Sequence, residues 1–235
     1  MSEAAVRDFT PAVSVSVIQK DVTILGDCMN VMPRFPDHCF DMIICDPPYG
    51  VTDHDWDKII PPDKMWQQFC GLIKPNGAIV LFYQQPFTTD LINSNRKMFR
   101  YPLAWVKNLA TGHLNAKIQP LRKHEDILVI YKSKPYYCAQ KTLVSNVSGN
   151  GLTDRYLVTV LTFAKDSPNL HPTQKPLGLA QQLIETYTRP GELVIDCCAG
   201  CGTTGLAAKI VRRHFVQIER ELSYYKIAEK RSGDL

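Results

Sequence analysis

The stretch LVIDCCAGCGTTGLAAK, residues 193–209, decides the fold class because it passes from a strand through a tight turn into a helix. The apolar run Leu193–Ile195 predicts a buried strand, which ends in Asp196. Gly200 and Gly202 allow the backbone to approach a ligand closely, and the helix that follows presents unpaired N–H groups at its start. A Gly-x-Gly pair alone is weak evidence of a ligand site, but here a strand precedes it and a helix follows it, as such a site requires.

The next predicted strand, residues 215–218, is followed by a second acid, Glu219. Its distance along the chain from Gly200 is close to the roughly 20 residues at which an acid reaches ribose hydroxyls in nucleotide-binding folds. No Gly-Lys-Ser/Thr follows the glycine turn, so the sequence excludes a Walker phosphate loop. A plain strand-to-helix turn and an adenosine-type ligand site remain as alternatives, and the two acids at strand ends favour the second.

Strand and helix patterns alternate along the rest of the chain. The predicted strands are 22–25, 41–45, 78–83, 101–106, 127–131, 193–195 and 215–218. The predicted helices are 28–35 with Asp27 as its cap, 62–73, 88–98, 177–187, 204–211 and 222–231. This alternation indicates an α/β protein with a parallel-type sheet covered on both faces, and the weakly periodic residues 132–169 are expected to form a partly irregular insertion.

A second motif ends the strand in FDMIICDPPYG, residues 40–50. Pro48 holds Pro47 in an extended conformation, so the Asp46 carboxylate and the Pro47 carbonyl offer two acceptors side by side. Two acceptors match the two hydrogens of an exocyclic amino group, and Tyr49 adds a flat surface for a planar ring. The alternative is a strand stopped by prolines with a tyrosine in the core. Because ligands bind outside the carboxyl ends of parallel strands, we expect this motif and the glycine turn to face one crevice.

Basic residues are concentrated in one part of the chain, although the net charge is only +4. Ten Lys and Arg lie between Asp90 and Asp154, where the only acids are Glu125 and Asp126. A run of charge is often only a solvated face, but a window this one-sided on an otherwise acidic chain favours a surface that binds a polyanion.

Size and composition place the chain among globular proteins, because 235 residues with 45% hydrophobic content can bury a core. No apolar stretch approaches the roughly 20 residues needed to cross a bilayer, and the N-terminus lacks a signal-peptide layout. We therefore expect a soluble intracellular protein with no membrane partner. The eight cysteines show no spacing typical of a secreted disulfide framework.

Three motifs in one order, DPPYG, HPTQKP (residues 171–176) and DCCAGCGTT, resemble those of the S-adenosylmethionine-dependent amino-methyltransferases of DNA. The order is that of the beta class, and the resemblance spans about residues 21–231. It implies a Rossmann-like methyltransferase sheet, circularly permuted, with a small target-recognition insertion. It further implies a catalytic half in residues 1–107, a basic loop and target-recognition region in 108–170, and a cofactor-binding half of the same domain in 171–235.

The resemblance assigns Asp46, Pro47, Pro48 and Tyr49 to the target base. It assigns the cofactor S-adenosylmethionine to Asp27, Thr173, Lys175, Asp196, Cys198, Ala199, Gly200, Gly202, Thr203, Thr204 and Glu219. Within that set, Asp27 is expected at the adenine amino group, Glu219 at the ribose hydroxyls, and Thr173 with Lys175 at the amino-acid end. His171 is expected to mark the entry of a helix.

This sequence departs from the family pattern where Cys197 and Cys198 replace Pro-Phe, which removes an aromatic contact to the cofactor, and where Cys201 replaces serine. No fourth ligand with metal-site spacing follows these cysteines, so we expect packing and no metal. The departure at residues 197 and 198 also keeps open a DNA-binding subunit with a decayed cofactor site.

The resemblance implies methylation of a flipped adenine at N6, because members that act on cytosine N4 more often carry serine in place of Asp46. Cytosine N4 and an RNA base remain alternatives. The resemblance further implies double-stranded DNA as the partner and the cytoplasm of a bacterial or phage-infected cell as the location, and it leaves a homodimer and a partner nuclease open. The loop 50–62 is expected to fold over the pocket, with Trp56 either as an aromatic residue of this lid or as part of the core. The predicted DNA contacts are Lys107, Asn115, Lys117, Arg122, Lys123 and His124. Residues 132–169 are expected to recognise the target sequence, with a site of only a few base pairs or with relaxed specificity.

Overall fold

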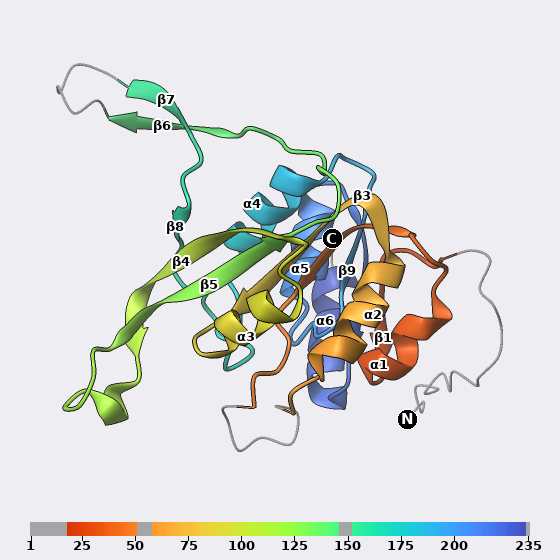
Figure 1. Ribbon diagram of the computed structural model, residues 1–235, viewed down its shortest axis with the longest axis horizontal. Helices are drawn as coiled ribbons and strands as arrows, with labels where there is room; N and C mark the ends of the chain where they lie inside the picture. The colour runs from red at the N-terminus through yellow and green to blue at the C-terminus, as the bar shows by residue number, and fades with distance from the viewer. Residues whose placement is uncertain (1–17, 51–57, 146–151, 234–235) are drawn as a thin grey trace.

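The computed structural model describes residues 18–50, 58–145 and 152–233, which form one large sheet with helices on both faces (Figure 1). The sheet has eight strands in the order β1-β10-β9-β2-β3-β5-β4-β8. Its strands are β1 (Val22–Leu25), β2 (Phe40–Cys45), β3 (Ile73–Tyr83), β4 (Phe99–Thr111), β5 (Arg122–Ile130), β8 (Val160–Thr162), β9 (Leu193–Asp196) and β10 (His214–Glu219). A separate hairpin consists of β6 (Lys141–Ser145) and β7 (Leu152–Tyr156).

Five neighbouring strands, β1, β10, β9, β2 and β3, are parallel, while β5 runs antiparallel to β3 and to β4. The first and last parts of the chain therefore build one sheet, in which β1 pairs with β10 and β2 with β9. The α/β class and the parallel core of the sheet that the sequence predicts are confirmed.

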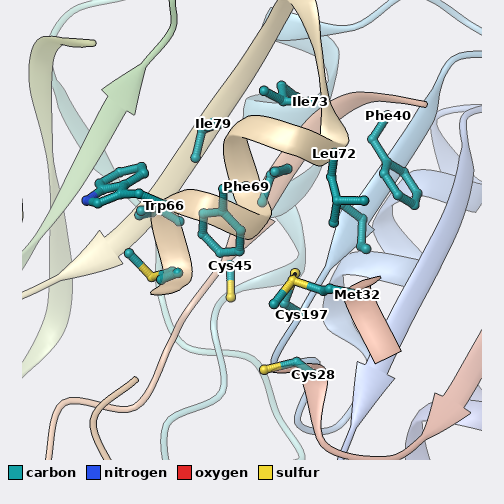
Figure 2. Close-up of a cluster of buried hydrophobic side chains, with 14 of the residues drawn as sticks. Cys28, Met32, Phe40, Cys45, Trp66, Phe69, Leu72, Ile73, Ile79 and Cys197 are labelled. Carbon is teal, nitrogen blue, oxygen red and sulfur yellow. Dashed lines mark hydrogen bonds between the residues drawn. The ribbon is translucent and has the colours of Figure 1, made fainter. Parts of the chain in front are cut away.

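The helices cover both faces of the sheet. Successive side chains of β2 point to opposite faces, and both sets are buried. Ile43 and Cys45 lie in a core cluster with the side chains of α1 (Cys28–Val31) and α2 (Pro62–Leu72) (Figure 2). Met42 and Ile44 lie in a second cluster with α4 (Leu177–Tyr187) and α5 (Thr203–Ile210). Two further helices are α3 (Phe87–Ser94) and α6 (Leu222–Gly233).

Several element ends differ from those that the sequence predicts. The helix capped by Asp27 continues beyond α1 only as the 3-10 turn Met32–Arg34, because Pro33 has no N–H for an α-helical bond. Pro75 to Gly77 interrupt the register of β3 with β2 as a bulge within the strand, which begins at Ile73 and not at the predicted residue 78. Gly77 is needed there, because an added Cβ would lie 2.8 Å from the Asp41 carbonyl oxygen.

The strands β4 and β5 extend well beyond their predicted ends and make a long hairpin that projects from the body (Figure 1). Their added residues are largely exposed, so the apolar alternation that marks the inner part of each strand is absent from the outer part. The weakly periodic region 132–169 supplies the β6–β7 hairpin and the edge strand β8.

Candidate active site

The two predicted motifs meet at one edge of the sheet. The strands β2 and β9 are parallel neighbours with Ile43 opposite Ile195, so the residues that follow Cys45 lie beside Asp196. A cavity of about 520 Å³ opens there and is lined by both motifs. The structure therefore brings the acid-proline-proline-tyrosine motif and the glycine turn to one crevice, as predicted.

In the first motif, Tyr49 is fixed against Asp46. Its hydroxyl lies within hydrogen-bonding distance of Asp46 Oδ1 and 2.8 Å from the Phe82 carbonyl oxygen. The ring contacts those of Tyr83 and Phe87, with centroids 5.1 Å and 6.4 Å away. Tyr49 thus packs against the core, as in the alternative of a proline-stopped strand with a core tyrosine. It also lines the cavity with Asp46.

Asp46 lies in a buried network of alternating charges. Lys175 Nζ forms an ion pair with Asp46 Oδ2 and lies 3.4 Å from Glu125 Oε2, while Lys107 Nζ lies 2.5 Å from Glu125 Oε1. Two carboxylates and two ammonium groups balance one another, which compensates for removing them from water. Lys175 also lines the cavity, with Thr173 and Asp196.

The pKa values in this network follow burial and neighbouring charge. Burial raises the pKa of Asp46, and Lys175 opposes that rise. Burial alone lowers the pKa of Lys175, but Asp46 and Glu125 more than offset it and the pKa is raised. Burial favours the neutral form of Glu125, yet Lys175 and Lys107 together lower its pKa. Lys175 and Glu125 are therefore charged near neutral pH.

Asp196 anchors the start of the glycine turn. It accepts a hydrogen bond from Thr204 Oγ1 at 2.5 Å and another from the Cys198 N–H at 3.0 Å. Burial raises the pKa of Asp196 to about 7, against the effect of these two donors.

Glu219 anchors the same turn from the end of β10. Its two carboxylate oxygens accept the N–H groups of Gly200 and Glu221, each at 2.7 Å. Burial raises the pKa of the Glu219 carboxyl. Both acids at strand ends therefore hold the turn in place while they line the cavity.

The remaining predicted cofactor residues divide between the cavity wall and its support. Asp27 caps α1 by accepting the Met29 N–H at 2.8 Å and lines the cavity. Gly202 lies behind the wall, where an added Cβ would be 2.7 Å from the Cα of Ala228. The other predicted residues that line the cavity are Thr173, Cys198, Ala199, Gly200, Thr203 and Thr204.

His171 lies at the cavity, although the sequence predicts only a helix-entry role. Its ring centroid is 4.2 Å from that of Tyr224, and its Nδ1 is 3.1 Å from Thr173 Oγ1. Sequence reasoning missed Tyr224, which lines the same cavity from α6. It carries no motif that could have identified it.

The cysteines of the glycine turn are packed in two places. Cys197 lines the cavity with Cys28 and Cys45 and belongs with them to the buried cluster of Figure 2, where its sulfur is 3.4 Å from Met32 Sδ. Cys201 lies apart, 3.1 Å from Arg231 Nη1. Within the three described ranges, no group of His, Cys, Asp or Glu has the arrangement of a metal site.

Five of the six predicted DNA contacts are exposed on the outer part of the β4–β5 hairpin. These are Asn115, Lys117, Arg122, Lys123 and His124. Lys107 is a correction, because its side chain is buried against Glu125 and does not reach a surface. The alternation of β4 explains this, since Lys107 lies on the same side of the strand as the buried Trp105.

Trp56, expected over the pocket or in the core, lies outside the described residues.

Sequence reasoning also missed Glu125, which joins Lys107 to Lys175. The available signal was that Glu125 and Asp126 are the only acids in a long basic window.

No helix in the described ranges has the length and apolar character of a membrane span.

Comparison with known proteins identifies the family. The sequence profile of the family described as DNA methylase, for N6 and N4 methyltransferases, matches residues 40–230. The Type II methyltransferase M2.MboI of Moraxella bovis is 26% identical, over 89% of this chain and 86% of that protein. The putative methylase YubD of Escherichia coli K12 is 30% identical, over 88% of each.

Solved structures agree with this result. The M1.HpyAVI–SAM complex has a TM-score of 0.69 and 27% identity, covering 89% of this chain and 98% of that chain. The cytosine-N4-specific PvuII DNA methyltransferase shares the fold, with a TM-score of 0.67 and 16% identity over 89% of this chain and 85% of that chain. The chain therefore belongs to the DNA methylase family, whose members use S-adenosylmethionine to methylate the amino groups of adenine N6 or cytosine N4.

Proposed function

We propose that this chain transfers a methyl group from S-adenosylmethionine to the N6 amino group of adenine in double-stranded DNA. The observation that carries the proposal is the half-buried Asp46 carboxylate, held by Tyr49 and Lys175 in the cavity that the cofactor motif also lines. An acid at this position favours adenine, since related enzymes for cytosine N4 more often have serine there.

The residues of the cavity fit the cofactor. Asp196, Glu219 and Asp27 line it with carboxylates, which suit a ligand bearing an ammonium group, hydroxyls and an adenine amine. Each oxygen of Glu219 accepts one backbone N–H and keeps a lone pair for a ribose hydroxyl. When bound, S-adenosylmethionine supplies the activated methyl group. Asp196 would hold its methionine portion, Glu219 the ribose and Asp27 the adenine.

The amino group of the target base is a poor nucleophile, because its lone pair is delocalised into the ring. Asp46 and the Pro47 carbonyl would accept its two hydrogens and stabilise the positive charge that develops on nitrogen. Asp46 is also the carboxylate on which the proton released from that nitrogen can be held. Most of the rate enhancement would come from positioning and from these fixed acceptors.

Lys175 must yield Asp46 Oδ2 when the amino group arrives, and Glu125 supplies an alternative partner. Glu125 Oε2 is buried and makes no hydrogen bond within the described ranges. It lies only 3.4 Å from Lys175 Nζ, so a small movement transfers the ammonium group from one carboxylate to the other. Lys175 thereby favours the carboxylate form of Asp46 before the base enters and releases it afterwards.

The target nitrogen is inaccessible within a duplex, so the base must leave the stack and enter the cavity. Tyr49 offers a ring against which the base can pack. The exposed cations of the β4–β5 hairpin, with Lys117 and Lys123 among them, would contact the phosphates.

The direct test is to incubate the purified chain and S-adenosylmethionine with unmethylated plasmid DNA and to analyse the nucleosides by mass spectrometry. N6-methyladenine is the expected product, and N4-methylcytosine alone would contradict the proposed base. Parallel reactions with single-stranded RNA of the same sequence separate DNA from RNA as the substrate, and transfer confined to the RNA would contradict the proposed polymer.

A further inference from the structure

The end of the β4–β5 hairpin, residues 109–124, exposes large apolar side chains. Leu109, Leu114 and Ile118 are 69%, 101% and 81% exposed, and Leu121 is 37% exposed. A single exposed leucine is ordinary, but four such side chains within 13 residues of one hairpin call for a partner. We use "apolar tip" for Leu109, Leu114, Ile118 and Leu121.

Charge around the apolar tip is of one sign. Residues 109–124 contain Lys117, Arg122 and Lys123 together with two histidines, and they contain no acid. The three cations and the apolar tip lie on the same short segment, so a partner of the tip also meets the cations. A polyanion with apolar surfaces, such as the stacked bases of a nucleic acid, fits both features.

The hairpin projects from the sheet edge that carries the catalytic motif. In the ladder of β3 with β5, Tyr83 is opposite Asp126, and in that of β2 with β3, Cys45 is opposite Leu81. The carboxyl ends of β2 and β3 therefore lie at the same edge as the beginning of β5. Arg122 Nη1 ties the base of the tip to this edge by donating to Gln84 Oε1 at 3.2 Å. Figure 1 shows the hairpin extending outward from there.

We propose that the apolar tip inserts into the DNA duplex at the target base pair and packs in the space that the flipped base leaves. This inference rests on the proposed function and adds a specific role for Leu114 and Ile118. Removing a base from the stack exposes the faces of its neighbours, and an apolar side chain that covers them offsets part of the free energy of unstacking. Lys117 and Lys123 contact phosphates beside the insertion and supply affinity that is independent of base flipping.

The test compares two duplexes that carry the site methylated by the wild-type chain. One duplex is fully paired, and the other has an abasic position opposite the target base, which makes flipping easier. Single-turnover methyl transfer is measured for the wild type, for Leu114→Ser/Ile118→Ser and for Ile210→Ser. Ile210 is an exposed isoleucine at the end of α5, away from the hairpin, and serves as the matched control.

The tip variant is expected to be about tenfold slower than wild type on the paired duplex and nearly as fast on the abasic one. Ile210→Ser should match wild type on both. A tip variant that is unaffected on the paired duplex, or slowed equally on both, overturns the proposal. Lys117→Gln/Lys123→Gln should weaken binding to both duplexes alike and reduce the slope of log affinity against log salt by about 2.

Two further outcomes separate this inference from other failures. A wild-type chain that methylates no site in plasmid DNA contradicts the proposed function itself, and the inference falls with it. A wild-type dimer in light scattering that becomes monomeric in Leu114→Ser/Ile118→Ser assigns the apolar tip to contact between copies, which also overturns insertion.

Discussion

Lys175 forms an ion pair with Asp46 inside the crevice, although the two residues are 129 positions apart in the chain. The pair joins the strand end that would hold the target base to the segment that leads into α4. It is buried and is shared with Glu125, so its effect on Asp46 is stronger than that of a surface pair.

Lys175→Met is expected to move the acidic limb of the pH–rate profile to higher pH. Burial already raises the pKa of Asp46, and removal of the opposing ammonium raises it further. Because the carboxylate form accepts the amino hydrogens, transfer is lost as the pH falls through this pKa. Single-turnover rates of methyl transfer across a pH series give the position of this acidic limb. Lys74→Met breaks a more exposed pair with Asp41 and should leave the profile unchanged; an unchanged profile for Lys175→Met would rule out this role.

Glu125→Gln is expected to destabilise the fold by about 3 kcal/mol. It leaves the buried Lys107 without its carboxylate partner and leaves Lys175 paired with Asp46 alone. Urea denaturation measures the free energy of unfolding. Adding Lys107→Met to Glu125→Gln should recover part of the loss, since it removes one unpaired charge. Strictly additive losses in the double variant would show that the two residues are not coupled.

Cofactor affinity is expected to fall as the pH drops below about 7, the value to which burial raises the pKa of Asp196. Protonation removes the negative charge that attracts the cationic cofactor, so affinity decreases by up to about tenfold for each pH unit below the pKa. Isothermal calorimetry over a pH series measures this dependence. Asp196→Asn should bind weakly at every pH in the series; a variant that keeps the wild-type pH dependence would assign it to another group.

Gly202→Ala is expected to destabilise the protein more than Gly191→Ala does. Both glycines have positive φ, +77° and +83°, so alanine adds backbone strain of about 1–2 kcal/mol at either position. Only at position 202 does the new Cβ meet backbone, 2.7 Å from the Cα of Ala228, whereas nothing lies within 4 Å at position 191. The clash should add about 1–3 kcal/mol in denaturant titrations. Equal losses for the two variants would contradict a close approach between the turn and α6.

The crevice was predictable because its two motifs are local. Cys45 ends an apolar strand before Asp46, and Leu193–Ile195 do the same before Asp196, so each acid marks a carboxyl strand end in its own stretch of sequence. The rule that ligands gather at such ends then places both acids together. The structure confirms this through the pairing of β2 with β9.

The charge network was not predictable, because it depends on how distant segments pair. Lys107 is buried because the β4–β5 ladder continues outward and places it beside Glu125. Lys175 belongs to a third segment of the chain, before α4. In the sequence, Lys107 is one base among ten in a basic window. The bulge at Pro75–Gly77 has the same origin, since the pairing of β3 with β2 absorbs residues that alone are typical of a turn.

The most direct measurement is methyl transfer by Asp46→Asn, with cofactor binding followed in parallel by calorimetry. The substitution keeps the shape of the side chain but replaces one acceptor oxygen with a donor, so the amino group of the base loses a partner. The predicted result is transfer reduced by about a hundredfold or more, with the affinity for S-adenosylmethionine close to that of the wild type. Transfer at the wild-type rate would contradict the central role of Asp46.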